Sequence, residues 1–445
     1  MRAKVEELHG RLAQVRALGL AGRFSQGLEQ IDSLAESAEA TGFRPLMAEV
    51  WLEQARLQSS ATNTAAALVS AHRSARAFLG SGQMRGVAEA WILVVASLQQ
   101  QGPQMAQELE RWLQYLDEAI VAQGNPLVLR GEYERRLAFI RMVQGRPAEG
   151  LEHARKAVAL QERLRGDGSA LAYALVELLR AAAVVGNYEE AMAAGQRAVA
   201  MRKTTVGLEH PATLQVLSLI GALQGMTWHL ADSTATYEQV LAIMRRMPET
   251  NYLELNAALN NLAVIYVEQG RHAEGELLLE QALAILDEHK ARESFNGVIS
   301  LQSLAESKYL RGDHAGALKL ARESLALAEK AVSPRNLVLA VVLTTLGEAE
   351  LEAGSASRAR AVLERALPLL EELRAPPKEA GHARFALART LEKLGVERPR
   401  MLTLLARARK DFDEAGAPAG RLRASWDEWV KARRLEASPQ LQQPQ

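Results

Sequence analysis

Cysteine is absent from the 445 residues of this chain, and aromatic residues make up only 5% of them. Without cysteine the chain has no disulfide, no thiolate nucleophile and no zinc site built on cysteine ligands. Lys plus Arg and Asp plus Glu number 53 each, so no net charge favours nucleic acid or an anionic membrane as a partner. No run of 18 apolar residues exists, and residues 1–7 lack the apolar core of a signal peptide. We therefore expect a cytoplasmic protein.

The motifs of common catalytic sites are also missing. The sequence contains no Gly-rich phosphate loop ending in Gly-Lys-Ser/Thr and no kinase set of His-Arg-Asp and Asp-Phe-Gly. Its nine histidines include no pair spaced four residues apart, as a helical zinc site would require. We expect no catalytic residue, no metal site and no cofactor, and conclude that this chain is not an enzyme.

The residues that dominate the sequence favour helices. Ala, Leu, Glu and Arg are abundant, and the hydrophobic fraction of 48% is enough to form a folded core. A turn signal, usually Gly, recurs every 40 to 43 residues. The ten turns lie at Gly22, Thr62, Gly102, Gly145, Gly186, Thr227, Gly270, Gly312, Gly354 and Gly395. We interpret each Gly as a left-handed helix cap, a conformation that only a residue without Cβ adopts freely.

Each repeat is predicted to contain two helices, one on either side of the turn. In the most regular unit, residues 255–266 and 276–286 both place apolar side chains at helical spacing. A single helix pair cannot bury both of its apolar faces, so neighbouring units must stack into a solenoid. Small residues recur where the helices would approach most closely, as at Ala263, Gly275 and Ala282. This pattern favours tetratricopeptide repeats over HEAT repeats of similar length.

A resemblance to known families follows from these segments. Residues 260–266, residues 282–285 and the linker at 207–211 resemble the 42-residue tetratricopeptide repeats of kinesin light chains. The whole chain, through residues 15–28, 42–49 and 385–429, resembles the C-terminal repeat arrays of myxobacterial Hanks-type serine/threonine kinases. The resemblance implies an all-α, right-handed α-solenoid of about ten helix-turn-helix repeats. We expect it to span residues 1–416, followed by a capping helix at 417–437 and a disordered tail at 438–445.

The resemblance also implies a binding groove lined by the first helix of each repeat. In the regular units the residues expected in this partner-binding groove are Arg135, Phe139, Tyr173, Arg180, Gln215, Asn260, Val264, Glu268, Gln302, Glu306, Tyr309 and Glu348. In kinesin-light-chain-like repeats an Asn side chain holds the backbone of an extended ligand, a role that Asn260 would take here. The groove has arginines early and glutamates late, which would suit a peptide with acidic residues at one end and basic ones at the other. The alternative is that these are ordinary solvated charges.

Three functional classes are compatible with this sequence. The first is a non-catalytic scaffold that binds a protein or peptide partner in the concave groove. The second is a regulatory or sensor arm of a serine/threonine kinase whose catalytic domain is not part of this chain. The third is a receptor for a signalling peptide or small ligand. All three exclude nucleic acid and membrane as partners, and none requires homo-oligomerisation.

Overall fold

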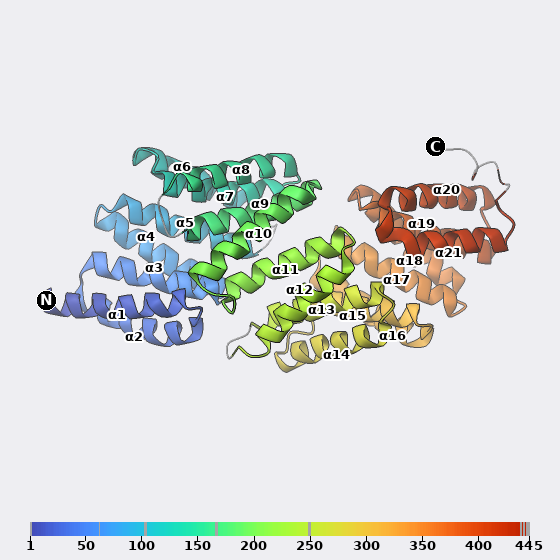
Figure 1. Ribbon diagram of the computed structural model, residues 1–445, viewed down its shortest axis with the longest axis horizontal. Coiled ribbons are helices and arrows are strands. Elements are labelled where there is room, and N and C mark those ends of the chain that lie inside the picture. Colours follow the sequence, from blue (N-terminus) through green and yellow to red (C-terminus); the bar gives the residue numbers. More distant parts are fainter. Residues whose placement is uncertain are drawn as a thin grey trace. The chain divides into compact units, whose positions relative to one another are not determined.

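The chain folds entirely into helices where its structure is described. The computed structural model describes residues 2–61, 63–101, 105–164, 168–247, 251–436, 438 and 441. Within these residues the chain forms 21 α-helices and no strand, which confirms the predicted all-α fold (Figure 1). None of the described helices combines the length and the apolar composition needed to cross a membrane. The predicted turn positions Thr62 and Gly102 lie outside the described residues.

The helices follow one another as ten pairs. The first helices of the pairs are α1 (Arg2–Leu20), α3 (Arg44–Ser60), α5 (Met84–Gln101), α7 (Leu127–Val143), α9 (Ser169–Val185), α11 (Pro211–Met226), α13 (Tyr252–Glu268), α15 (Phe295–Leu310), α17 (Leu337–Glu352) and α19 (Pro377–Leu394). The second helices are α2 (Phe24–Thr41), α4 (Thr64–Gly80), α6 (Ala106–Ala122), α8 (Pro147–Glu162), α10 (Tyr188–Thr205), α12 (Leu230–Met244), α14 (His272–Glu288), α16 (His314–Ala331), α18 (Ala356–Glu372) and α20 (Arg398–Ala415).

The chain divides into two compact units, and the division falls within the pair α11 and α12. Unit 1 comprises Met1–Leu223 and Ile243–Asn251, and unit 2 comprises Gln224–Ala242 and Tyr252–Gln445. Within unit 1, α1, α3, α5, α7 and α9 contact one another in succession, as do α13, α15, α17 and α19 within unit 2. This contact between successive first helices places them on the inner side of each unit, where a solenoid has its concave surface.

Where the structure describes them, the glycine turns inside the pairs adopt the predicted left-handed conformation. At Gly186 the backbone φ is 87°, and its amide donates to the carbonyl of Ala183 at 3.1 Å. In the pair that lacks a Gly at the expected position 227, the following residue, Trp228, takes the left-handed conformation with φ of 64°. The turn is therefore preserved without glycine, although an L-residue is strained there.

Small residues occupy the closest helix contacts, as the repeat pattern predicts. Ala263 and Ala282 are fully buried. A Cβ added at Gly275 would lie 3.0 Å from the carbonyl oxygen of Ala263, and one at Gly347 would lie 2.4 Å from Cγ of Leu363. Larger side chains at these positions would push the helices apart, which explains the small-residue spacing that identifies the repeat.

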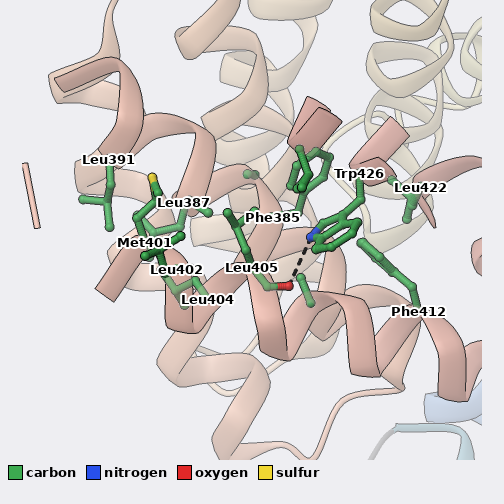
Figure 2. Packing of buried hydrophobic residues seen from close by; sticks show 14 of the residues in the cluster. Phe385, Leu387, Leu391, Met401, Leu402, Leu404, Leu405, Phe412, Leu422 and Trp426 are labelled. Carbon is green, nitrogen blue, oxygen red and sulfur yellow. Dashed lines mark hydrogen bonds between the residues drawn. The ribbon is translucent and has the colours of Figure 1, made fainter. Parts of the chain in front are cut away.

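A terminal helix covers the apolar end of the last pair. This helix, α21 (Gly420–Ala432), follows a short 3-10 turn at Ala417–Ala419, within the range 417–437 where a capping helix is expected. Figure 2 shows Trp426 packed beside Phe385 and Phe412, with its indole Nε1 donating to the carbonyl of Leu405 at 3.1 Å. Trp429 lies edge-on to Phe385, with 5.9 Å between the ring centroids. The two tryptophans thus shield a surface that an uncapped repeat would leave exposed.

Two residues of the tail at 438–445 are described. Leu441 is buried against the same C-terminal cluster, and its carbonyl accepts a hydrogen bond from Arg409 Nη1 at 3.3 Å. Leu441 therefore differs from the expected disordered tail. Apart from Ser438 and Leu441, the tail lies outside the described residues.

Candidate partner-binding surfaces

In unit 1 the inner surface presents a tyrosine between arginines. Tyr173, near the start of α9, is 47% exposed. The guanidinium carbon of Arg135 on α7 lies 5.6 Å from its ring centroid, and that of Arg202 at the end of α10 lies 4.4 Å from it. Both distances allow attraction between a cation and the ring face. Tyr173, Glu177 and Arg180 follow at helical spacing and so share one face of α9.

Of these arginines, Arg135 has an internal carboxylate partner. Its Nη2 lies 2.6 Å from Oε2 of Glu132, one turn earlier on α7. Burial alone would lower the pKa of Arg135, but the Glu132 carboxylate outweighs it and raises that pKa. Burial would likewise raise the pKa of Glu132, and Arg135 instead holds it below its usual value. The pair stays ionised and neutralises itself.

Arg202 is buried and Arg136 is half-buried, and neither has such a partner among the described residues. Arg136 donates from Nη1 to the amide oxygen of Gln99 at 2.7 Å, while its Nε has no hydrogen-bond partner among the described residues. Burial, with the neighbouring Arg135, lowers the pKa of Arg136 to about 9. Arg202 is only 5% exposed, and its Nε and Nη2 are buried without a partner in the described part of the chain. Neither guanidinium forms an ion pair there, which is costly for a buried charge.

A buried glutamate completes this group. Glu177 is 8% exposed, and its Oε1 has no partner among the residues that the structure describes. Burial raises the pKa of Glu177, although Arg135, Arg180 and Arg136 oppose that rise. We call Arg135, Arg136, Tyr173, Glu177, Arg180 and Arg202 the arginine cluster.

The remaining predicted residues of unit 1 lie in different environments. Gln215 is exposed on α11, and Arg180 is half-buried on α9. Phe139 on α7 is half-buried and packs against the apolar core formed by α5, α6 and α7. Phe139 thus has a packing role that the groove prediction did not include.

In unit 2 the predicted groove amide is not open. Asn260 on α13 is only 6% exposed, and its Oδ1 is buried without a hydrogen-bond partner in the described part of the chain. Its neighbour Asn261 donates to the hydroxyl of Tyr237 at 3.1 Å, at a contact between helices. Val264, one turn after Asn260, is 38% exposed on the same helix. The ligand-holding role of Asn260 stays a prediction, and Val264 is the open member of this pair.

The glutamates expected to make the late groove acidic are paired with cations. Glu268 on α13 lies 2.8 Å from Nζ of Lys378 on α19. Burial would lower the pKa of Lys378, but Glu268 and Glu306 outweigh it and raise that pKa. Because α13 and α19 are separated by the first helices of two intervening repeats, this pair crosses the inner surface of unit 2.

Glu348 is the most enclosed of these carboxylates. It is 5% exposed, and its Oε2 lies 2.7 Å from Nε2 of His382 on α19. Burial would raise the pKa of Glu348, yet His382 and Arg389 hold it below its usual value. Burial would lower the pKa of His382, and Glu348 instead raises it. The pair is therefore an ionised imidazolium and carboxylate at mildly acidic pH.

Glu306 and Tyr309 on α15 also contact residues from later in the chain. Glu306 lies 3.6 Å from Nη2 of Arg421 on the terminal helix α21 and accepts a hydrogen bond from Gln302 at 3.1 Å. The hydroxyl of Tyr309 accepts a hydrogen bond from Arg389 at 3.3 Å. We call the residues that meet here the unit 2 network: Glu268, Glu306, Tyr309, Glu348, Lys378, His382, Arg389 and Arg421.

The network leaves little space between its members. A cavity of about 70 Å³ lies beside Glu306, Lys378, Glu379 and His382. Ligand pockets usually have at least about 300 Å³. The inner surface of unit 2 is therefore largely occupied by its own ion pairs, and the carboxylates of Glu268, Glu306 and Glu348 do not form the unpaired acidic field that their positions suggested.

Several residues of these surfaces were not predicted from the sequence: Arg136, Glu177, Arg202, Lys378, His382, Arg389 and Arg421. Lys378, His382 and Arg389 are on the first helix of the tenth repeat, at spacings that share the inner face, so their position in the repeat could have identified them. Arg202 is at the end of a second helix, and nothing in the repeat pattern marks it. Among the described residues, no three metal-ligating side chains gather around a common point.

The chain is a helical-repeat protein of the solenoid class. This follows from its paired helices, their glycine turns and the contacts between successive first helices in each unit. Comparison with family models is more specific. Residues 130–204 and 297–372 match one tetratricopeptide-repeat model, and residues 257–286 match another. The chain therefore contains tetratricopeptide repeats, and its fold is that of a tetratricopeptide-repeat solenoid.

Two solved structures with the same fold cover most of the chain, and a third match covers less than half of it. The apo form of the quorum sensor NprR from B. thuringiensis is 15% identical with a TM-score of 0.57, over 80% of this chain and 99% of that one. A Rap protein complexed with Competence and Sporulation Factor is 13% identical with a TM-score of 0.51, over 90% and 99%. Kinesin light chain-like repeats of Podosopora anserina are 25% identical with a TM-score of 0.40, over 44% and 93%. A comparison with curated proteins finds no match.

Proposed function

We propose that this chain is a non-catalytic binding scaffold that holds an extended peptide, or an extended segment of a protein partner, against its first helices. The observation on which the proposal rests is Tyr173. A tyrosine on an inner helix is half exposed, although two guanidinium groups lie at its ring and could have covered it. Tyrosine is enriched at binding hot spots because it offers a large contact area and loses little side-chain entropy on binding.

Two further observations support a peptide as the ligand. Gln215 and Val264 are also exposed on first helices, so polar and apolar contacts are both available on inner surfaces. Among proteins of this fold, NprR is a quorum sensor and the Rap protein is complexed with Competence and Sporulation Factor. We propose that the solenoid of this chain also recognises another molecule, whose identity we do not name.

The test is a comparison of two tyrosine substitutions in unit 1. Tyr173→Ala removes the exposed ring on α9, and Tyr188→Ala removes a ring of similar exposure, 40%, at the start of the second helix α10. The purified variants are used as bait in a lysate of the source cells. We expect Tyr173→Ala to lose a specific partner that the parent and Tyr188→Ala retain. Loss of the partner only with Tyr188→Ala would move the binding site to the outer helices.

The finer alternatives lead to different tests. A regulatory arm of a serine/threonine kinase stays a prediction from the resemblance, and a cytoplasmic location stays a prediction from the sequence. Reading the gene upstream of Met1 tests it, because an in-frame kinase domain would support it and an independent start site would contradict it. The role of signalling-peptide receptor is a special case of the scaffold and shares its test.

A further inference from the structure

The arginine cluster of unit 1 has unused hydrogen-bonding groups that point to the chemistry of the partner. We propose that it binds a carboxylate of an acidic peptide segment, from an Asp or Glu side chain, together with a backbone amide of the same segment. This inference rests on the proposed peptide-binding function and specifies which peptide is preferred.

The arginine cluster contains guanidinium N–H groups that donate no hydrogen bond within the described residues. Arg136 Nε, Arg202 Nε and Arg202 Nη2 are all buried and lack a partner among the described residues. Adjacent N–H groups of a guanidinium, such as Nε and Nη2 of Arg202, match the two oxygens of a carboxylate. Arg180 on α9 also forms no ion pair in the described part of the chain. A carboxylate therefore has the acceptor geometry that matches these donors.

The arginine cluster also contains a carboxyl oxygen that accepts no hydrogen bond within the described residues. Glu177 Oε1 is buried without a partner in the described residues, and Arg135, Arg136 and Arg180 act on its carboxyl group. A ligand that supplied only negative charge would be repelled by an ionised Glu177. A peptide supplies a backbone N–H donor within a few ångströms of its own acidic side chain, so it satisfies donor and acceptor together. The backbone of a nucleic acid offers phosphate oxygens but no comparable N–H donor.

Positive charge exceeds negative charge around the arginine cluster. Four arginines face two glutamates in this region, counting Glu132 with the arginine cluster, and burial raises the pKa of Glu177. The local charge is therefore positive, although the whole chain is neutral. In unit 2, by contrast, Lys378, His382 and Arg421 already pair with the glutamates. An acidic segment thus has a complementary site in unit 1, whereas the glutamates of the unit 2 network already have cations beside them.

The exposed ring of Tyr173 adds a second element of recognition. It lies between Arg135 and Arg202, so an apolar or aromatic residue beside the acidic one would contact the ring while the carboxylate reaches the guanidinium groups. The preferred segment is therefore an acidic residue flanked by a bulky apolar one.

The experiment uses a phage-displayed library of random peptides as the probe and the full chain as the immobilised target. We expect the selected peptides to be enriched in Asp or Glu next to an apolar residue. A fluorescein-labelled copy of the most enriched peptide then measures affinity by fluorescence anisotropy. Arg180→Gln removes a half-buried charge of the cluster, and Arg197→Gln removes an exposed charge on the second helix α10 as a matched control.

The inference predicts that Arg180→Gln weakens binding about tenfold, because a charge-assisted hydrogen bond is lost, while Arg197→Gln leaves the affinity unchanged. The affinity of the parent should also fall as salt rises from about 50 to 300 mM, which tests the same charge recognition should Arg180→Gln not fold. Circular dichroism of each variant checks folding.

Other results overturn the inference in distinguishable ways. Selected peptides that lack acidic residues, but no longer bind Tyr173→Ala, would refute the acidic preference and leave the proposed function standing. Failure of the library to yield any binding peptide would contradict both. A fluorescein-labelled single-stranded RNA of 12 nucleotides is tested in parallel. Its binding to the parent and its loss in Arg180→Gln would assign the arginine cluster to nucleic acid instead.

Discussion

At the scale of single residues, the closest helix contacts depend on side chains with no more than one carbon atom. Ala282 on α14 is fully buried, and its carbonyl accepts a hydrogen bond from Asn256 Nδ2 at 2.9 Å. A larger side chain there must displace α13 or distort this bond. The repeat pattern of small residues is therefore a packing requirement and not a compositional accident.

Ala282→Leu should destabilise unit 2 by about 1–3 kcal/mol through overpacking. The matched control is Ala284→Leu, the same change two residues later at an exposed position of α14. Urea unfolding of both variants measures the difference. Equal midpoints for Ala282→Leu, Ala284→Leu and the parent would show that position 282 faces solvent.

The pair of Glu348 and His382 makes the stability of unit 2 depend on pH. The folded-state pKa of His382 is raised, so its contribution is fully present below the ordinary histidine pKa and is lost as pH rises through the raised value. The folded-state pKa of Glu348 is lowered, so its contribution is present above the ordinary glutamate pKa and is lost as pH falls through the lowered value. Arg389 and Arg421 also act on this site, and both favour the ionised form of Glu348.

His382→Gln should therefore reduce stability most at mildly acidic pH, by about 1.5–3 kcal/mol, the usual value for a hydrogen bond between charged groups. Thermal unfolding of parent and variant at pH 6 and at pH 9 measures this. We expect the gap between their midpoints to narrow at pH 9. A gap that widens at pH 9 would mean that His382 is neutral in the folded state.

At the scale of helices, the terminal helix α21 closes the last repeat through Trp426. The indole is 4% exposed and packs in the cluster that Figure 2 shows. Because solenoid energetics are mostly local, damage to this cap should remain near the C-terminal end.

Trp426→Ala should cost about 3–5 kcal/mol in this cluster, as buried Trp→Ala changes do. Hydrogen exchange should then rise in α19, α20 and α21 and stay unchanged in α3 to α10 of unit 1. Uniform loss of protection along the whole chain would contradict local capping.

A second element-scale contact joins α13 to α19. Lys378→Met keeps the side-chain stem but leaves the mostly buried carboxylate of Glu268 without its cation. The cost should be about 1–3 kcal/mol, and the double change with Glu268→Gln should recover part of it. A double-mutant cycle by urea unfolding measures the coupling. Zero coupling energy would show that the pair adds nothing to unit 2.

At the scale of the whole molecule, the fold could be predicted from sequence and the surfaces only in part. The positions of Gly186 and the other turn residues determine where helices end. Helix ends can therefore be predicted from the local sequence. The pairing of Glu268 with Lys378 spans 110 residues and depends on how tightly successive repeats wind. Winding results from packing details that repeat periodicity does not encode. For this reason the late glutamates were expected to be free, whereas the exposure of Tyr173 follows from its helix face alone.

The central claim is that the partner contacts the first helices. Hydrogen exchange of the full chain, with and without the peptide selected from the library, tests this most directly. The account predicts that bound peptide slows exchange in α7 and α9 of unit 1 while α8 stays unchanged. Slower exchange confined to α8 and the first half of α10, with α7 and α9 unaffected, would contradict it.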